Sequence, residues 1–102
     1  MIVEYTRYKI ANDKQKEFEN AYTRAENSLK MSPHCLRYEL SHCVEEPEYY
    51  TLRIEWDSKE GHINGFRTSP EFKPFIEAVK PFFNDIQEMH HYRFTNIKGE
   101  KT

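Results

Sequence analysis

The stretch HCLRYELSHCVEEPEYYTLRIEW, residues 34–56, decides the fold of this chain. Its two halves alternate apolar and polar residues around the turn segment EEPE, which predicts a β-hairpin. One register places Arg37 opposite Glu55. The same register places Glu39 opposite Arg53, whereas a shift by two positions would set Glu39 against Glu55, a disfavoured like-charge pair. The hairpin is therefore predicted to have one polar face and one apolar face.

The apolar face of the hairpin is rich in aromatic residues. It is predicted to pair Leu36 with Trp56, Tyr38 with Ile54, Leu40 with Leu52, and His42 with Tyr50. An apolar sheet face must be covered by another layer, so helices are expected to pack against it.

Further elements are predicted on both sides of the hairpin. Residues 2–10 are rich in β-forming residues and carry apolar side chains on both faces, which indicates a strand covered on both sides. Residues 13–30 keep helical spacing after Asn12, a favourable N-cap residue. Residues 86–94 alternate again and predict a fourth strand, in which His90 and His91 point to opposite faces.

The segment WDSKEGHINGFRTSPEFKPF that follows the hairpin predicts a broken helical layer. Asp57 and Glu60 have the spacing of a capping box, so a short helix is expected to begin directly after Asp57. The glycines at 61 and 65 weaken this helix. Ser69 can cap a second helix with Pro70 at its first position.

The order of elements is β-α-β-β-α-β, the ferredoxin-like arrangement of an α+β protein. It predicts a four-stranded antiparallel sheet with helices on one face, and leaves the other face to water or a second subunit. We expect residues 1–95 to form one domain and residues 96–102 a polar C-terminal tail.

The composition indicates a globular domain and excludes several classes of partner. The chain has 102 residues, of which 37% are hydrophobic and 31% charged, and its net charge of −2 comes without a basic run. We therefore expect no nucleic-acid and no membrane partner, and a cytoplasmic location. Cys35 and Cys43 lie on one extended segment about 26 Å apart, so both thiols are expected to be free.

The apolar face of the sheet is the strongest candidate for a binding site. Side chains from the strands are expected to meet side chains from the broken helical layer, and the set comprises Tyr38, His42, Tyr50, Trp56, His62, Phe66 and Phe75. A cleft of this composition suits a flat, hydrophobic small molecule. The alternative is that these side chains fill one another's space as ordinary core.

Metal and nucleophile motifs give little signal. No HxxxH, HExxH or CxxC pattern is present. Glu88 with His90 and Tyr92 is the only local candidate for a metal site, and an ordinary hydrogen bond across strands or an interface is the simpler interpretation. Cys35 follows His34 directly, and adjacent strand residues face opposite ways, so they are not expected to form a catalytic pair. We predict no metal.

The segment WDSKEGHINGFRTSPEFKPF after a β-hairpin resembles the Trp-Asx/Glu-Ser…Ser-Pro-x-Phe signature of the antibiotic biosynthesis monooxygenase (ABM) family. The resemblance extends to SPHCLRYELSHC and EMHHYRF. It implies a homodimeric α+β barrel and an aromatic small-molecule ligand. It also implies a cofactor-independent monooxygenase that oxidises an aromatic or quinol-type substrate with O2.

Within this resemblance, His62 and His42 are the candidate proton acceptors, and the substrate-binding candidates are Tyr38, Tyr50, Trp56, Phe66 and Phe75. Family members commonly carry a His where Gly65 or Phe66 stands here. The haem-degrading branch also uses an Asn in the first strand, which this chain lacks there. Alternatives are a non-catalytic module that binds a small molecule or haem, a haem-degrading monooxygenase, and a lactone isomerase on the same fold.

Overall fold

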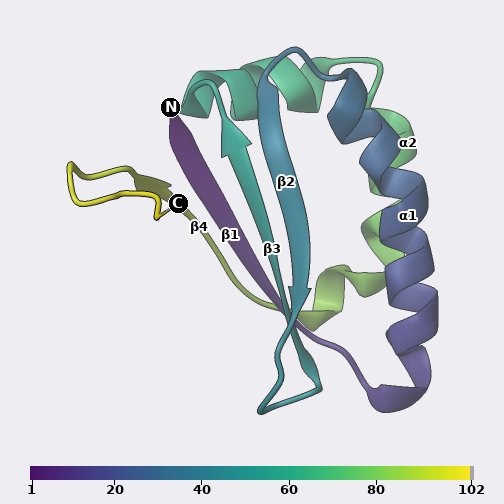
Figure 1. Ribbon diagram of the computed structural model, residues 1–102. Helices are drawn as coiled ribbons and strands as arrows, with labels where there is room; N and C mark the ends of the chain where they lie inside the picture. The colour runs from purple at the N-terminus through teal and green to yellow at the C-terminus, as the bar shows by residue number, and fades with distance from the viewer. Residues whose placement is uncertain (102) are drawn as a thin grey trace.

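The computed structural model describes residues 1–101 and contains one antiparallel sheet with strand order β2-β3-β1-β4. The strands are β1 (Ile2–Lys9), β2 (Cys35–His42), β3 (Tyr49–Trp56) and β4 (Ile86–Arg93). The long helix α1 (Gln15–Met31) and the shorter α2 (Phe72–Val79) lie on one side of this sheet (Figure 1). The ferredoxin-like order and the one-sided helical layer predicted from the sequence are both confirmed.

Short helical segments join the main elements. They are η1 (Asn12–Lys14), η2 (Gly61–Gly65), η3 (Phe66–Thr68) and η4 (Lys80–Asp85), and η2 is a π-helix. Together η2, η3 and α2 form the broken helical layer that the sequence predicts. No helix in residues 1–101 is long and apolar enough to cross a bilayer.

The hairpin register follows the charge pairing, with one exception at its end. Arg37 lies opposite Glu55, as predicted, and their side chains approach to 3.4 Å. A shift in register between Cys35 and Arg37 places Cys35, and not Leu36, opposite Trp56. The predicted pairing of Leu36 with Trp56 is therefore wrong, and Leu36 is 47% exposed. Both cysteines are free, as predicted.

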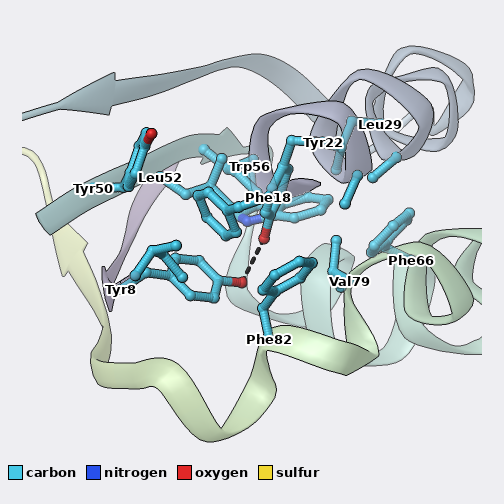
Figure 2. Close-up of a cluster of buried hydrophobic side chains, with 14 residues drawn as sticks. Tyr8, Phe18, Tyr22, Leu29, Tyr50, Leu52, Trp56, Phe66, Val79 and Phe82 are labelled. Carbon is cyan, nitrogen blue, oxygen red and sulfur yellow. Dashed lines mark hydrogen bonds between the residues drawn. The ribbon is translucent and has the colours of Figure 1, made fainter. Parts of the chain in front are cut away.

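The core between sheet and helices is an aromatic cluster centred on Phe18 (Figure 2). The Phe18 ring lies 4.7 Å from Tyr8, 5.2 Å from Tyr22 and 4.8 Å from Tyr50 between ring centroids. The hydroxyls of Tyr8 and Tyr22 meet at 2.5 Å, and burial raises the pKa of Tyr8 to about 12. Two buried hydroxyls thus satisfy each other inside the core.

The start of the layer after β3 differs from the predicted capping box. The Ser58 hydroxyl accepts the backbone N–H of Gly61 at 2.8 Å. The Asp57 carboxylate instead accepts a hydrogen bond from His34 Nδ1 at 2.9 Å, and this bond lowers the pKa of Asp57. Asp57 therefore ties the residue before β2 to the end of β3. Ser69 likewise donates its hydroxyl to the Phe66 carbonyl at 2.6 Å and closes η3, rather than capping α2.

The two glycines of η2 allow His34 to lie directly against this π-helix. A Cβ atom on Gly65 would stand 2.5 Å from Cδ2 and Nε2 of the His34 ring. A Cβ atom on Gly61 would stand 2.0 Å from the Asp57 carboxylate. The glycines that weaken the helix in isolation are therefore required by the contact with the His34–Asp57 pair.

We expect Gly65→Ala to destabilise the protein by about 1–3 kcal/mol, because the added methyl group overpacks the His34 contact. Urea denaturation measures the change. Gly99→Ala is the matched control, since a Cβ there meets nothing within 4 Å. The double variant Gly65→Ala with His34→Ala should recover part of the loss, and an equal loss with and without His34 would show that the contact is not the cause.

Candidate functional site

A cavity of about 620 Å³ lies between the helix-facing side of the sheet and the broken helical layer. Most of its wall is apolar, and aromatic rings come from both layers. The lining residues are Glu4, Thr6, Tyr8, Tyr22, Leu52, Ile54, Trp56, His62, Phe66, Arg67, Phe72, Phe75, Ile76, Val79, Phe83, Ile86 and Met89. The cavity therefore combines a large apolar surface with a few polar groups, which is typical of small-molecule sites.

The carboxylate of Glu4 is one of these polar groups, and it is buried. Its Oε1 accepts the indole N–H of Trp56 at 2.9 Å, and its Oε2 accepts the hydroxyl of Thr6 at 3.3 Å. Burial is the largest influence on this group and raises the pKa of Glu4 above its ordinary value, although both hydrogen bonds act in the opposite direction. Glu4 is thus a buried carboxylate with a raised proton affinity.

His62 lies beside this carboxylate. Its ring stacks on Trp56 with centroids 4.3 Å apart and planes 10° apart. Its Nε2 is 3.6 Å from Glu4 Oε1, and its Nδ1 is 2.8 Å from His91 Nε2. Burial, followed by the positive charge of Arg67 and the contact with His91, lowers the pKa of His62 to about 3. His62 is therefore a neutral imidazole at neutral pH.

The sheet register explains how these residues come together. Glu4 on β1 lies opposite His91 on β4, and Ile2, two positions before Glu4 on the same face, lies opposite Trp56 on β3. The π-helix η2 then places His62 above Trp56. Four side chains from three strands and one helical segment thus form one polar cluster, which we call the Glu4 cluster (Glu4, Trp56, His62 and His91).

Four of the residues singled out from the sequence line the cavity: Trp56, His62, Phe66 and Phe75. Phe66 lies between layers, with its ring centroid 5.2 Å from Trp56 and 5.3 Å from Phe75. These four residues are brought together as the sequence predicts.

The other three candidates lie outside this cavity. Tyr38 donates its hydroxyl to Glu26 at 2.9 Å, where it lines a separate hollow between α1 and β2. Tyr50 stands at the opposite end of the core from Phe66 (Figure 2) and donates to Glu19. His42 stacks on Tyr50 at 4.1 Å and hydrogen-bonds the Pro47 carbonyl through Nε2. Their contacts are with helix α1 and the hairpin turn, not with the Glu4 cluster.

Glu4 and His91 did not stand out in the sequence, although the position of Glu4 in the first strand was a signal for that residue. Glu4 occupies the same face of the first strand as Ile2 and Tyr8, and an acidic residue in phase with buried positions is unusual. His90 and His91 do point to opposite faces, and His91 is the one that belongs to the Glu4 cluster. His90 lies beside Tyr92 on the other face, 6.4 Å between rings.

The cluster leaves His62 poorly suited to bind a haem iron. One ring nitrogen contacts His91 and the other faces Glu4, so both ring nitrogens are already engaged by side chains of the cluster. The chemistry that the arrangement does offer is proton transfer, because a buried carboxylate with raised pKa lies at the wall of an apolar cavity.

The fold and this cavity define a ferredoxin-like α+β domain that is hollow between its sheet and its helices. Residues 1–78 match the family model of antibiotic biosynthesis monooxygenases, so the chain belongs to the antibiotic biosynthesis monooxygenase family. This confirms the resemblance found in the sequence.

Individual relatives share the sequence or the fold of this chain. The uncharacterized protein YczJ of Bacillus subtilis is 28% identical over 93 residues, which covers 91% of this chain and 98% of YczJ. A Bordetella bronchiseptica protein described by the same family name superimposes with a TM-score of 0.74 at 24% identity, covering 92% of this chain and 96% of that one. A conserved protein of Methanosarcina mazei Go1 gives a TM-score of 0.76 at 22% identity, covering 92% of both chains. At these identities the structures establish the shared fold alone.

Proposed function

We propose that this protein is a cofactor-independent monooxygenase that oxidises an aromatic or quinol-type small molecule with O2. The observation that carries the proposal is the position of Glu4, a buried carboxylate at the wall of an aromatic cavity. The family to which the chain belongs carries the monooxygenase name, which supports the same reaction class.

The cavity supports binding of a flat aromatic molecule. Its volume of about 620 Å³ falls within the range of roughly 300–1,000 Å³ that small-molecule sites occupy. The rings of Phe66, Phe72 and Phe75 line one wall and Trp56 another, so an aromatic substrate would meet ring faces and edges on both sides.

Glu4 is the better proton acceptor of the cluster. The pKa of Glu4 is raised, whereas the pKa of His62 is lowered to about 3, so the carboxylate binds a proton more strongly than the neighbouring imidazole. We assign proton removal to Glu4. We assign to His62 the role of holding the carboxylate against the cavity, through its contact with Glu4 and its stacking on Trp56.

The reaction balances with the chain's own residues and O2. Glu4 takes a proton from an activated C–H of the substrate, and the resulting carbanion gives one electron to O2. The substrate radical and superoxide combine to form a C–O bond, and the peroxide anion takes the proton back from Glu4. Loss of water then converts the original CH2 group to C=O. The protein contributes binding, proton transfer and exclusion of bulk water.

Oxygen consumption tests this proposal directly. Wild-type protein should consume O2 with at least one member of a panel of anthrones and reduced quinols, and Trp56, the only Trp of the chain, reports ligand binding by fluorescence. Quenching of Trp56 without O2 uptake across the panel would identify a non-catalytic binding module instead. No uptake and no quenching would contradict the assignment of the cavity as a site.

We also infer that the protein is a homodimer formed through the helix-free face of the sheet. Two aromatic rings project there, Tyr5 (37% exposed) on β1 and Tyr92 (50% exposed) on β4. Their ring centroids lie 5.5 Å apart. Arg53 adds a hydrogen bond to the Tyr5 hydroxyl at 3.2 Å. An exposed aromatic patch framed by charged side chains is typical of a protein interface.

A charge on this face should weaken the dimer. We expect Tyr92→Glu to raise the dimer dissociation constant at least about tenfold, because a carboxylate would lose its hydration in the interface. Sedimentation velocity over a concentration series measures the change. Val44→Glu, at an 86% exposed position in the hairpin turn, is the control and should leave the dimer unaffected. A monomeric wild-type protein would contradict the inference.

A further inference from the structure

We propose that Glu4, His62 and His91 bind one divalent first-row transition metal ion, and that the bound ion blocks proton removal by Glu4. One potential ligand atom from each of these side chains lies within 4.8 Å of the other two. The three residues come from β1, η2 and β4, so the fold and not a local motif creates the set. The blocking effect rests on the proposed function, whereas the binding site does not.

The residue types are those that a transition metal prefers. Imidazole nitrogen and carboxylate oxygen together suit Zn²⁺, Fe²⁺, Co²⁺ and Ni²⁺. Bonds of about 2.0–2.2 Å to a tetrahedral ion place neighbouring ligand atoms roughly 3.3–3.6 Å apart. Of the two contacts of His62, the one to Glu4 at 3.6 Å lies at the upper limit of that range, and the one to His91 at 2.8 Å is shorter. These contacts use different ring nitrogens of His62, so one ring has to rotate before all three ligands face one ion.

Two features outside the three ligands hold them in place. The indole N–H of Trp56 and the hydroxyl of Thr6 fix the two carboxylate oxygens of Glu4. Stacking on Trp56 fixes the plane of the His62 ring. Hydrogen bonds and packing of this kind orient the ligands of a metal before it binds.

The surroundings also set a limit on affinity. Arg67 on the cavity wall and Lys59 place positive charge near the two histidines, which opposes a second cation. The burial of Glu4 acts the other way, because an ionised carboxylate in a poorly solvated position gains from a counter-charge. A site with three protein ligands leaves at least one coordination position for water or a ligand from the cavity.

Cobalt titration tests the binding site without any substrate. The full-length protein, treated with EDTA and dialysed, should bind one Co²⁺ per chain with visible d–d absorption, and Zn²⁺ should displace it. His91→Ala and the more conservative His91→Asn should each weaken binding at least tenfold. His90→Ala, on the opposite face of β4, is the matched control and should bind as wild type. Absence of the absorption bands, or unchanged binding by both His91 variants, would overturn the site.

The free cysteines need to be distinguished from this site, because thiolates also bind Co²⁺. A thiolate ligand adds an intense charge-transfer band in the near ultraviolet, and the proposed site of nitrogen and oxygen ligands lacks that band. A spectrum dominated by thiolate charge transfer, and lost in Cys35→Ser or Cys43→Ser, would assign the ion to the cysteines and overturn the proposal.

The effect on activity is measured separately. Stoichiometric Zn²⁺ should abolish O2 uptake by the stripped protein, and EDTA should restore it, because the positive charge of the bound ion lowers the basicity of the Glu4 carboxylate. Uptake that is unchanged or increased in Zn²⁺-loaded protein would overturn the blocking effect. A stripped protein that consumes no O2 while it still binds Co²⁺ would overturn the proposed function and leave the metal site standing.

Discussion

Replacing Glu4 by Gln is expected to lower the rate of O2 consumption by about 10²- to 10⁴-fold, the usual contribution of a general base. The amide has nearly the shape of the carboxylate and can still accept the Trp56 N–H through its carbonyl oxygen, so the fold should survive. It cannot take a proton from the substrate. The expected signature is therefore a loss in kcat with little change in ligand affinity, measured by an oxygen electrode and by Trp56 fluorescence.

Glu88→Gln provides the matched control for this experiment. Glu88 is an exposed carboxylate on β4, on the other face from His91, and its replacement changes net charge by the same amount. A rate that falls equally in both variants would indicate an electrostatic effect on the whole molecule. A Glu4→Gln protein that keeps its rate, while His62→Asn loses it, would transfer the role of base to His62.

The fold could be predicted from the sequence because its signals are local and redundant. The alternation in residues 34–56 sets which side chains share a face, and the Arg37–Glu55 pairing sets the register. Only the pairing at the end of the hairpin was predicted wrongly, because a shift in register leaves no clear signature in the alternation of apolar and polar residues. Capping roles were less predictable. The Asp57 carboxylate could accept a hydrogen bond either from the backbone at the start of the helix or from the distant His34, and the tertiary structure brings it to His34.

The candidate site was predicted only in part, because periodicity reports the face of a strand but not the position along it. Tyr38, Tyr50 and Trp56 all point toward the helices. Helix α1 packs closely over the first two, and its Glu26 and Glu19 accept hydrogen bonds from the hydroxyls of Tyr38 and Tyr50. The broken layer above Trp56 instead leaves a cavity. Where helices pack tightly and where they leave space depends on the whole arrangement of side chains, which no single segment encodes.

The Glu4 cluster needed a contact between elements far apart in the chain. Glu4 meets His91 only because β1 lies between β3 and β4, and His62 joins them only because η2 follows the end of β3. The sequence signal was an acidic residue in phase with the buried side chains of the first strand. Such a residue has to find a partner, and its partner cannot be identified before the strand order is known.

The largest expected loss of stability is for Phe18→Ala, at about 3–5 kcal/mol. The Phe18 ring is fully buried and packs against Tyr8, Tyr22, Tyr50 and Phe82, so its removal leaves a void that these rigid rings cannot fill. The total stability of a domain is only about 5–15 kcal/mol, so this is a large fraction of it. Urea denaturation measures the change, and near-ultraviolet circular dichroism reports whether the packing of the three tyrosines, Tyr8, Tyr22 and Tyr50, persists.

The variant Phe75→Ala tests whether the Phe75 side chain belongs to the core or to the cavity wall. The Phe75 ring is half-buried and faces the existing hollow, so its removal should cost only about 1–2 kcal/mol of stability. Ligand binding should respond in the opposite order: Phe75→Ala should weaken the affinity at least tenfold, while Phe18→Ala, under conditions where it stays folded, should leave it largely unchanged. If Phe75→Ala instead destabilises the protein as much as Phe18→Ala, its side chain belongs to the core, and the space beside Trp56 is not maintained for a ligand.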